Sequence, residues 1–341
     1  MLKGAVVIAC ALGGGLGFLT TPAQAREAPL DRSPTTRVIA ASSPEARSLL
    51  STSFVAKQSG EDRLITANVV VDRPTTRMLV VVSGRCWPSR GEPTQTFRDV
   101  RNIWPGRSSP TSVDLTFLAT AKKPGRHDCE TRVRTCDVGR CDGQRGRGTA
   151  RVMTHRESRE DHTHMRISGP LPAGTQQARL ANGQNGDIPV QSGSTQTVES
   201  SFVLNPAWGP VDFDATLSVT NCIKATYPDS CAAVKDKRLH GSSQIETTAY
   251  LRQLRFDGSI CATMKATSVP GQKAQLVTWE EHHATLRYRF RDFRGKLHAR
   301  CTPVVAVVIE VRVARGNGIV IEPGAAGSLK SWTTLRPALS R

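Results

Sequence analysis

Hydrophobic and polar residues alternate with the period of a β-strand through much of this 341-residue chain. The hydrophobic runs are short and rich in Val, Thr, Leu and Ile, and they are separated by Asp-Gly, Pro-Gly, Arg-Gly and Gly-Asn-Gly turns. The sharpest alternation lies at 286–291, where Leu, Tyr and Phe take turns with three arginines. This pattern predicts an all-β chain that folds as sandwiches.

Helix signals are sparse in the sequence. Ser43 and Pro44 are typical of a helix N-cap and a first helical position, so a short helix is expected over 43–50. Residues 232–240 are a second candidate for a short helix. We therefore expect little helix in the folded chain.

The second half of the chain repeats features of the first half. In each half, two β-rich runs end on a cysteine, and a glycine turn then precedes another cysteine. Valine-rich runs align easily by chance, but three matches in the same order favour duplication of one domain. The matched segments are 69–86 with 202–222, 124–133 with 257–265, and 165–167 with 286–288.

The domain organisation expected from these patterns is two tandem immunoglobulin-like β-sandwich domains stapled by disulfides. Cys86-Trp87 does not show the Cys, Trp, Cys spacing of a true immunoglobulin domain. The predicted parts are a signal peptide over 1–25, an N-terminal segment over 26–60, a first sandwich over 61–168, a Gly-, Pro- and Asn-rich linker over 169–197, a second sandwich over 198–327 and a C-terminal tail over 328–341.

The N-terminus has the features of an export signal. Lys3 precedes an apolar run at 5–12, and Ala23-Gln24-Ala25 has the small residues of a signal-peptidase site. The later apolar run at 304–309 is too short to span a membrane. We therefore expect a secreted, extracellular protein with no transmembrane anchor.

Eight cysteines follow the predicted signal peptide, four in each half. In an oxidising compartment an even cysteine count predicts a disulfide framework. The internal match favours Cys86–Cys129 and Cys222–Cys261, which would leave Cys136 for Cys141 and Cys231 for Cys301, but it does not fix the connectivity. The candidate cysteines are Cys86, Cys129, Cys136, Cys141, Cys222, Cys231, Cys261 and Cys301.

The net charge of +17 indicates attraction to anionic partners, through a field that salt screens over about 8–10 Å. On a strand, Arg287, Arg289 and Arg291 point outward together, spaced by about 7 Å. Arg132 and Arg134 add charge in the first half. Because arginine binds carboxylate and phosphate in bidentate fashion, these residues are the candidate site for an anionic polymer or cell-surface partner. The alternative is a solvated strand face whose charges prevent edge pairing.

Nucleic acid is disfavoured as the specific partner, because aromatic residues make up only 5% of the chain and single strands stack on aromatic side chains. The sequence contains no familiar catalytic or cofactor motif. The pairs His162/His164 and His282/His283 could bind copper or zinc if a carboxylate converged on them. Such pairs are usually polar surface, so neither a metal nor a cofactor is predicted.

The function expected from the sequence is that of a secreted, non-catalytic binding protein that takes anionic polymers or cell-surface material through the arginine-rich strand face. One alternative is a secreted hydrolase with its site between the two domains. The other is a structural or protein-interaction module, such as an adhesin or an inhibitor. The sequence leaves the ligand and the oligomeric state open.

Overall fold

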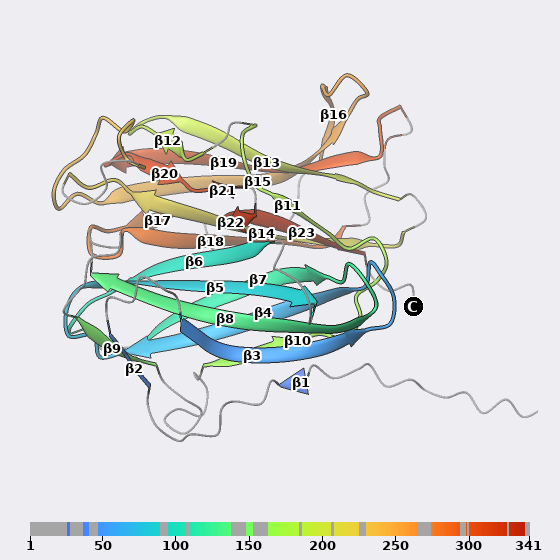
Figure 1. Ribbon diagram of the computed structural model, residues 1–341. Helices are drawn as coiled ribbons and strands as arrows, with labels where there is room; N and C mark the ends of the chain where they lie inside the picture. Colours follow the sequence, from blue (N-terminus) through green and yellow to red (C-terminus); the bar gives the residue numbers. More distant parts are fainter. Residues whose placement is uncertain are drawn as a thin grey trace, which may run out of the picture.

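The computed structural model describes residues 26–27, 37–40, 47–88, 95–106, 110–137, 148–152, 163–183, 186–205, 208–224, 230–264, 274–293, 298, 300–325 and 327–337. These residues form strands, which are arranged in four sheets, together with turns and irregular segments that connect them (Figure 1). The all-β prediction is confirmed. The predicted signal peptide, 1–25, lies outside the described residues.

The first sandwich packs two sheets around one hydrophobic core. In one sheet β4 pairs with β7 on one side and with β10 and then β9 on the other, and β1 and β2 continue outward from β10 and β9. The facing sheet has the order β6-β5-β8-β3. The strands are β1 (Arg26–Glu27), β2 (Arg37–Ala40), β3 (Arg47–Ala56), β4 (Asp62–Asp72), β5 (Met78–Pro88), β6 (Thr96–Ile103), β7 (Thr111–Thr120), β8 (Gly125–Asp137), β9 (Thr149–Val152) and β10 (His164–Ile167).

The second sandwich is built in the same way around its own core. Here β14 pairs with β18 on one side and with β23 and then β20 on the other, and β11 and β12 lie outside these. The facing sheet has the order β13-β19-β15, with β16 and β17 on the free side of β15. The strands are β11 (Gln176–Arg179), β12 (Ile188–Val190), β13 (Thr195–Val203), β14 (Val211–Asn221), β15 (Ser243–Leu254), β16 (Ile260–Met264), β17 (Ala274–Val277), β18 (His283–Phe293), β19 (Val304–Gly316), β20 (Ile319–Ile321) and β23 (Trp332–Pro337).

Both sandwiches therefore have one strand order, which is that of a jelly roll. The immunoglobulin-like prediction gave the two facing sheets but not this order. Alternation along the sequence shows which face of a strand is buried, whereas the choice of neighbour depends on contacts distant in sequence.

The strands that take equivalent places are not those that the sequence matched. By its place β4 corresponds to β14 and β5 to β15, whereas the match aligned them with β13 and β14. The other two matches disagree with the strand order in the same way. The sequence matched β8 with β16 and β10 with β18, whereas β8 takes the place of β19 and β10 takes the place of β23. Valine-rich strands of one fold resemble each other closely, so similarity alone does not select the partner.

Some segments differ from the predicted secondary structure. Residues 47–50, expected as the end of a helix, begin β3, whose pairing with β8 outweighs the local capping signal. Residues 230–240 form turns and irregular structure. The predicted linker, 169–197, contributes β11, β12 and the start of β13 to the second sandwich, and the predicted tail contains β23. β11 carries four half-buried side chains without hydrophobic alternation, so no strand pattern announces it.

The two sandwiches are joined by a hairpin near the C-terminus, made of β21 (Gly324–Ala325) and β22 (Ser328–Leu329). β22 adds to the first sandwich, parallel to β6, and β23 then returns to the second sandwich. Trp332 on β23 packs into the first core, with its ring centroid 5.4 Å from that of Phe97. In Figure 1 the two sandwiches lie one above the other, with β6 and β18 side by side at the junction.

Three disulfides join described cysteines, which confirms the predicted framework. Cys86–Cys129 ties β5 to its neighbour β8. In the second half the bonds are Cys222–Cys231 and Cys261–Cys301, so the favoured pairing of Cys222 with Cys261 is wrong. The end of β14 lies against the turn that carries Cys231, while Cys261 lies on the β16 hairpin. Cys136 is also disulfide-bonded, and its partner lies outside the described residues.

Because Trp332 belongs to the core of one sandwich and to a strand of the other, we expect Trp332→Ala to destabilise both together. A large buried aromatic replaced by alanine costs about 3–5 kcal/mol. Urea unfolding followed by circular dichroism measures this loss. As a control, Val203→Ala removes an exposed side chain and should change the unfolding free energy by less than about 0.5 kcal/mol. An effect of Trp332→Ala as small as that of the control would contradict the shared role.

Candidate binding site

The arginine row predicted on 286–291 lies on β18 and has the predicted alternation. Leu286, Tyr288 and Phe290 are buried in the second core. Arg289 and Arg291 are exposed, and Arg287 is half-buried at the junction with the first sandwich. The strand therefore does present its three arginines on the face opposite the core.

Aspartates compensate the charge of this row. Arg291 Nη1 lies 2.8 Å from Asp212 Oδ2, and Arg289 Nε lies 3.6 Å from Asp214 Oδ1. Asp214 also pairs with Arg336 on β23. These aspartates lie on β14, directly beside β18, so acidic and basic side chains of neighbouring strands meet on one face.

Arg287 reaches across the junction rather than into solvent. Its Nη1 lies 3.5 Å from Asp114 Oδ2, and its Nη2 donates to the backbone oxygen of Asp114 on β7. In the first sandwich, Arg132 Nε lies 3.6 Å from Glu130 Oε1. Arg134, also on β8, has no ion-pair partner among the described residues. The five predicted arginines are therefore divided between the two sandwiches and do not form one surface.

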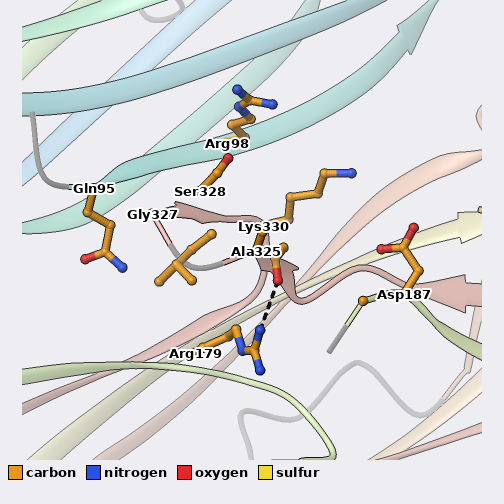
Figure 2. Close-up of a pocket in the computed structure, with 11 residues that line it drawn as sticks. Gln95, Arg98, Arg179, Asp187, Ala325, Gly327, Ser328 and Lys330 are labelled. Atoms are coloured by element: carbon orange, nitrogen blue, oxygen red, sulfur yellow. Dashed lines mark hydrogen bonds between the residues drawn. The ribbon is translucent and has the colours of Figure 1, made fainter. Parts of the chain in front are cut away.

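A groove of about 980 Å³ lies at the junction of the two sandwiches (Figure 2). Arg98 of β6 borders it from the first sandwich and Arg179 of β11 from the second. The β21–β22 hairpin supplies its floor. Gly324 in this hairpin has a φ of +80°, and a Cβ there would lie 2.2 Å from the backbone oxygen of Ser328, so the close turn requires glycine.

The cationic end of the groove holds two arginines in different states. Arg98 is exposed and has no hydrogen-bond or ion-pair partner among the described residues. Arg179 Nη1 donates to the backbone oxygen of Gly324 over 3.3 Å, which is the dashed line in Figure 2. Gln95 lies at the same end. This end can therefore donate several hydrogen bonds to an anionic group.

The other end of the groove holds one carboxylate, with a second one buried behind it. Asp187 lines the groove, and Lys330 Nζ donates to Oε1 of the buried Glu322 over 3.0 Å. The second oxygen of Glu322, Oε2, is buried without a hydrogen-bond partner among the described residues. Desolvation and the nearby Glu322 carboxylate raise the pKa of Asp187, while Ser230 and Lys330 oppose this shift. This end can accept hydrogen bonds from hydroxyl groups.

The groove could not be predicted from the sequence. Arg98, Arg179 and Lys330 are far apart in the chain and follow no shared motif. They meet only in the folded chain, where β22 pairs with β6 and β11 pairs with β23.

Of the histidines considered for metal binding, His282 and His283 lie buried at the junction. Their ring centroids are 4.6 Å apart. His283 Nδ1 lies 2.7 Å from Thr220 Oγ1, and Arg77 Nη2 lies 3.3 Å from His282 Nδ1. His162 lies outside the described residues, and His164 is half-buried on β10. In the described part of the chain no three His, Cys, Asp or Glu side chains converge as a metal site would require.

Burial keeps both junction histidines neutral. Desolvation, together with the charges of His283 and Arg77, lowers the pKa of His282 to about 2. Desolvation, with Lys330 and Arg101, lowers the pKa of His283 to about 3. These imidazoles stabilise the junction as uncharged groups and have no access to a ligand in the groove.

Comparison with known proteins leaves the family open. No protein-family model and no curated protein matches the chain. Solved structures overlap with it only loosely. A protein described as secreted, from Parabacteroides distasonis, is 8% identical, covers 93% of this chain and 100% of its own, and has a TM-score of 0.19. The tandem CBM22 domains of Xyn10C from Paenibacillus barcinonensis are 8% identical, cover 91% and 92%, and have a TM-score of 0.22. The stem and receptor-binding domain of spike protein P1 from bacteriophage PM2 is 7% identical, covers 90% and 100%, and has a TM-score of 0.21.

Within the described residues no helix is long and apolar enough to cross a membrane. The three disulfides indicate an oxidising compartment.

The junction histidines predict acid sensitivity. In the unfolded chain the pKa of each of these histidines is about 6.5, which is above its pKa in the folded protein. The unfolded state therefore binds more protons at low pH. The free energy of unfolding therefore does not depend on these histidines well above about pH 6.5. It decreases as the pH falls below that value, by up to about 1.4 kcal/mol per pH unit for each histidine. Urea unfolding at pH 7.5 and 4.5 measures the difference.

The variant His282→Gln/His283→Gln should show a smaller difference between the two pH values than the parent protein. The matched control is His298→Gln, because His298 is exposed. If the double variant lost as much unfolding free energy between pH 7.5 and 4.5 as the parent protein does, the acid sensitivity would come from other groups.

Proposed function

We propose that this protein is a secreted, non-catalytic binding protein that holds a segment of acidic polysaccharide in the groove between its two jelly rolls. The observation that carries the proposal is the exposed guanidinium of Arg98, which has no partner among the described residues and lies across the groove from Arg179. The disulfides support a place outside the cytoplasm.

The two ends of the groove suit the two kinds of group on such a polymer. A sugar carboxylate would accept hydrogen bonds from Arg98 and Arg179, and arginine holds carboxylates with directional, charge-assisted bonds. Hydroxyl groups would bind Gln95 and Ser328 beside the arginines and Asp187 at the other end, all of which line the same groove. The net charge of +17 would raise the encounter rate with any polyanion.

The groove supports this function better than the predicted arginine row does. Arg289 and Arg291 share Asp212 and Asp214, so a polyanion would have to compete with existing ion pairs. Arg132, similarly, lies beside Glu130. In the proposal the row adds to the general positive field, and the specific contacts lie in the groove.

One observation favours the hydrolase alternative. Asp187, whose pKa is raised, lies in the groove between the two domains and near Glu322, and hydrolysis of glycosidic bonds uses two carboxyl groups. Release of new reducing ends from polygalacturonate, abolished by Asp187→Asn, would replace the non-catalytic proposal by this one.

The binding proposal predicts a steep effect of salt. Binding to immobilised heparin or polygalacturonate should weaken steadily as sodium chloride rises, since the contacts are ionic. Arg98→Gln should weaken binding about tenfold and reduce the salt dependence, because one charge-assisted contact is lost. Isothermal titration calorimetry at several salt concentrations measures both.

Arg289→Gln is the matched control, because it removes one exposed arginine outside the groove. It should leave the affinity nearly unchanged. If Arg289→Gln weakened binding as much as Arg98→Gln, the arginine row or the overall charge would be responsible, and the groove proposal would be wrong.

A further inference from the structure

The hairpin between β15 and β16 presents an exposed aromatic side chain. Phe256 in its turn is 94% exposed, and Ile260 next to it is 48% exposed. Figure 1 shows this hairpin extending beyond the body of the second sandwich. An aromatic ring in this position contributes nothing to the core and exposes apolar surface to water, a cost that binding would remove.

The hairpin is held in one conformation. Within the turn, Arg255 N donates to Ser259 O over 2.8 Å, and Ser259 N donates to Asp257 Oδ1 over 2.8 Å. Gly258 has a φ of +80°, as a tight turn of this kind requires. The Cys261–Cys301 disulfide fastens the base of β16. The backbone that carries Phe256 is therefore held in place, which lowers the part of the binding entropy that comes from ordering the turn.

The first sandwich has a cavity of about 270 Å³ at its end, whose lining is mostly aromatic and aliphatic, with Gln95, Thr120, Lys122 and His127 as its polar members. Its lining includes Phe54, Trp87 and Leu118 and the stacked pair Phe97 and Phe117, whose ring centroids are 4.9 Å apart. A dry apolar cavity of about 150 Å³ is enough to bind benzene. The cavity can therefore receive the benzyl group of a phenylalanine.

The charges beside the ring and beside the cavity are complementary. Asp257 follows Phe256 in the exposed turn, and the exposed Lys122 borders the cavity. A phenylalanine entering the cavity with its neighbouring aspartate would bring the carboxylate toward the ammonium group of Lys122. Opposite charges at the rim of an apolar contact favour one register of docking.

The hairpin and the cavity face the same end of the molecule. The cavity lies where β5 and β7 end, and Figure 1 shows these strand ends on the same side as the β15–β16 hairpin, one on each sandwich. If two copies meet at this end and are related by a two-fold axis, the first sandwich of each copy faces the second sandwich of the other. Each copy then offers its hairpin to the cavity of the other, which makes a closed, self-complementary interface.

From this arrangement we propose that two copies of this chain form a dimer in which Phe256 of each fills the apolar cavity of the other, with Asp257 facing Lys122. The proposal does not depend on polysaccharide binding, because the groove and the cavity share only Gln95 in their linings, and none of Phe256, Asp257 and Lys122 lines the groove. It also has the opposite response to salt: since the whole chains repel each other through a charge of +17, added salt strengthens the dimer.

Sedimentation equilibrium of the full chain tests the proposal over about 1 to 100 µM protein, at low and high salt. The parent protein is expected to pass from one chain to two as concentration rises. Phe256→Ser should raise the dissociation constant of the dimer at least about tenfold, as removal of a buried aromatic anchor does. Leu276→Ser is the matched control, since Leu276 is an exposed apolar residue on β17, and it should leave the constant unchanged.

A charge exchange identifies the register. Lys122→Glu and Asp257→Lys should each weaken the dimer, and the double variant Lys122→Glu/Asp257→Lys should restore it, because each interface again pairs opposite charges. Lys122 and Asp257 are both exposed, so the variants retain the two sandwiches. Asp257→Lys also removes the hydrogen bond from Ser259 N within the turn, so recovery of the dimer in the double variant, and not the loss in the single variant, identifies the register.

Three results would overturn the proposal. One is a parent protein that stays a single chain at the highest concentration. Another is a dimer that Phe256→Ser does not weaken. The third is a single-chain protein that cosediments with phosphatidylglycerol vesicles through Phe256, which would make a lipid surface the partner of the hairpin.

Discussion

The arrangement of the whole molecule depends on one stretch of chain that serves two sheets. After β20 the backbone leaves the second sandwich, lies parallel to β6 of the first as β22, and returns to pair with β14 as β23. Trp332 fixes this path, since its ring is buried against Phe97 in the first core while its backbone belongs to a sheet of the second. The sandwiches are therefore joined by buried hydrophobic packing as well as by polar contacts.

The groove is a product of this crossing. Its floor is the hairpin that bridges the sandwiches, and its cationic end combines Arg98 from one sandwich with Arg179 from the other. The buried pair His282 and His283 lies at the same junction, and His283 N donates to the side-chain oxygen of Asn102 on β6. The junction is thus polar and buried beside β18, where Asn102 Nδ2 and Asp99 Oδ2 have no hydrogen-bond partner among the described residues, and it is open to solvent beside β22.

The sequence predicted what local alternation decides. The all-β class, the two-sheet architecture and the buried face of 286–290 follow from side chains that point alternately in and out. It could not predict the jelly-roll order, because strand partners are chosen by contacts distant in sequence. β11 shows the limit clearly: its side chains carry no hydrophobic pattern, and it is a strand because β23 pairs with it. The same limit applies to the site. The arginine row was predicted correctly as a strand face, but only the pairing of β14 with β18 reveals the aspartates that compensate it.

The late position of Trp332 has a consequence for how the protein is made. Phe97 is synthesised early, and the side chain that completes its surroundings is added near the end of the chain. Until then β6 remains an open edge and the first core lacks one wall. The first jelly roll therefore completes its core only after residues 328–332 have been synthesised, about 230 residues after Phe97.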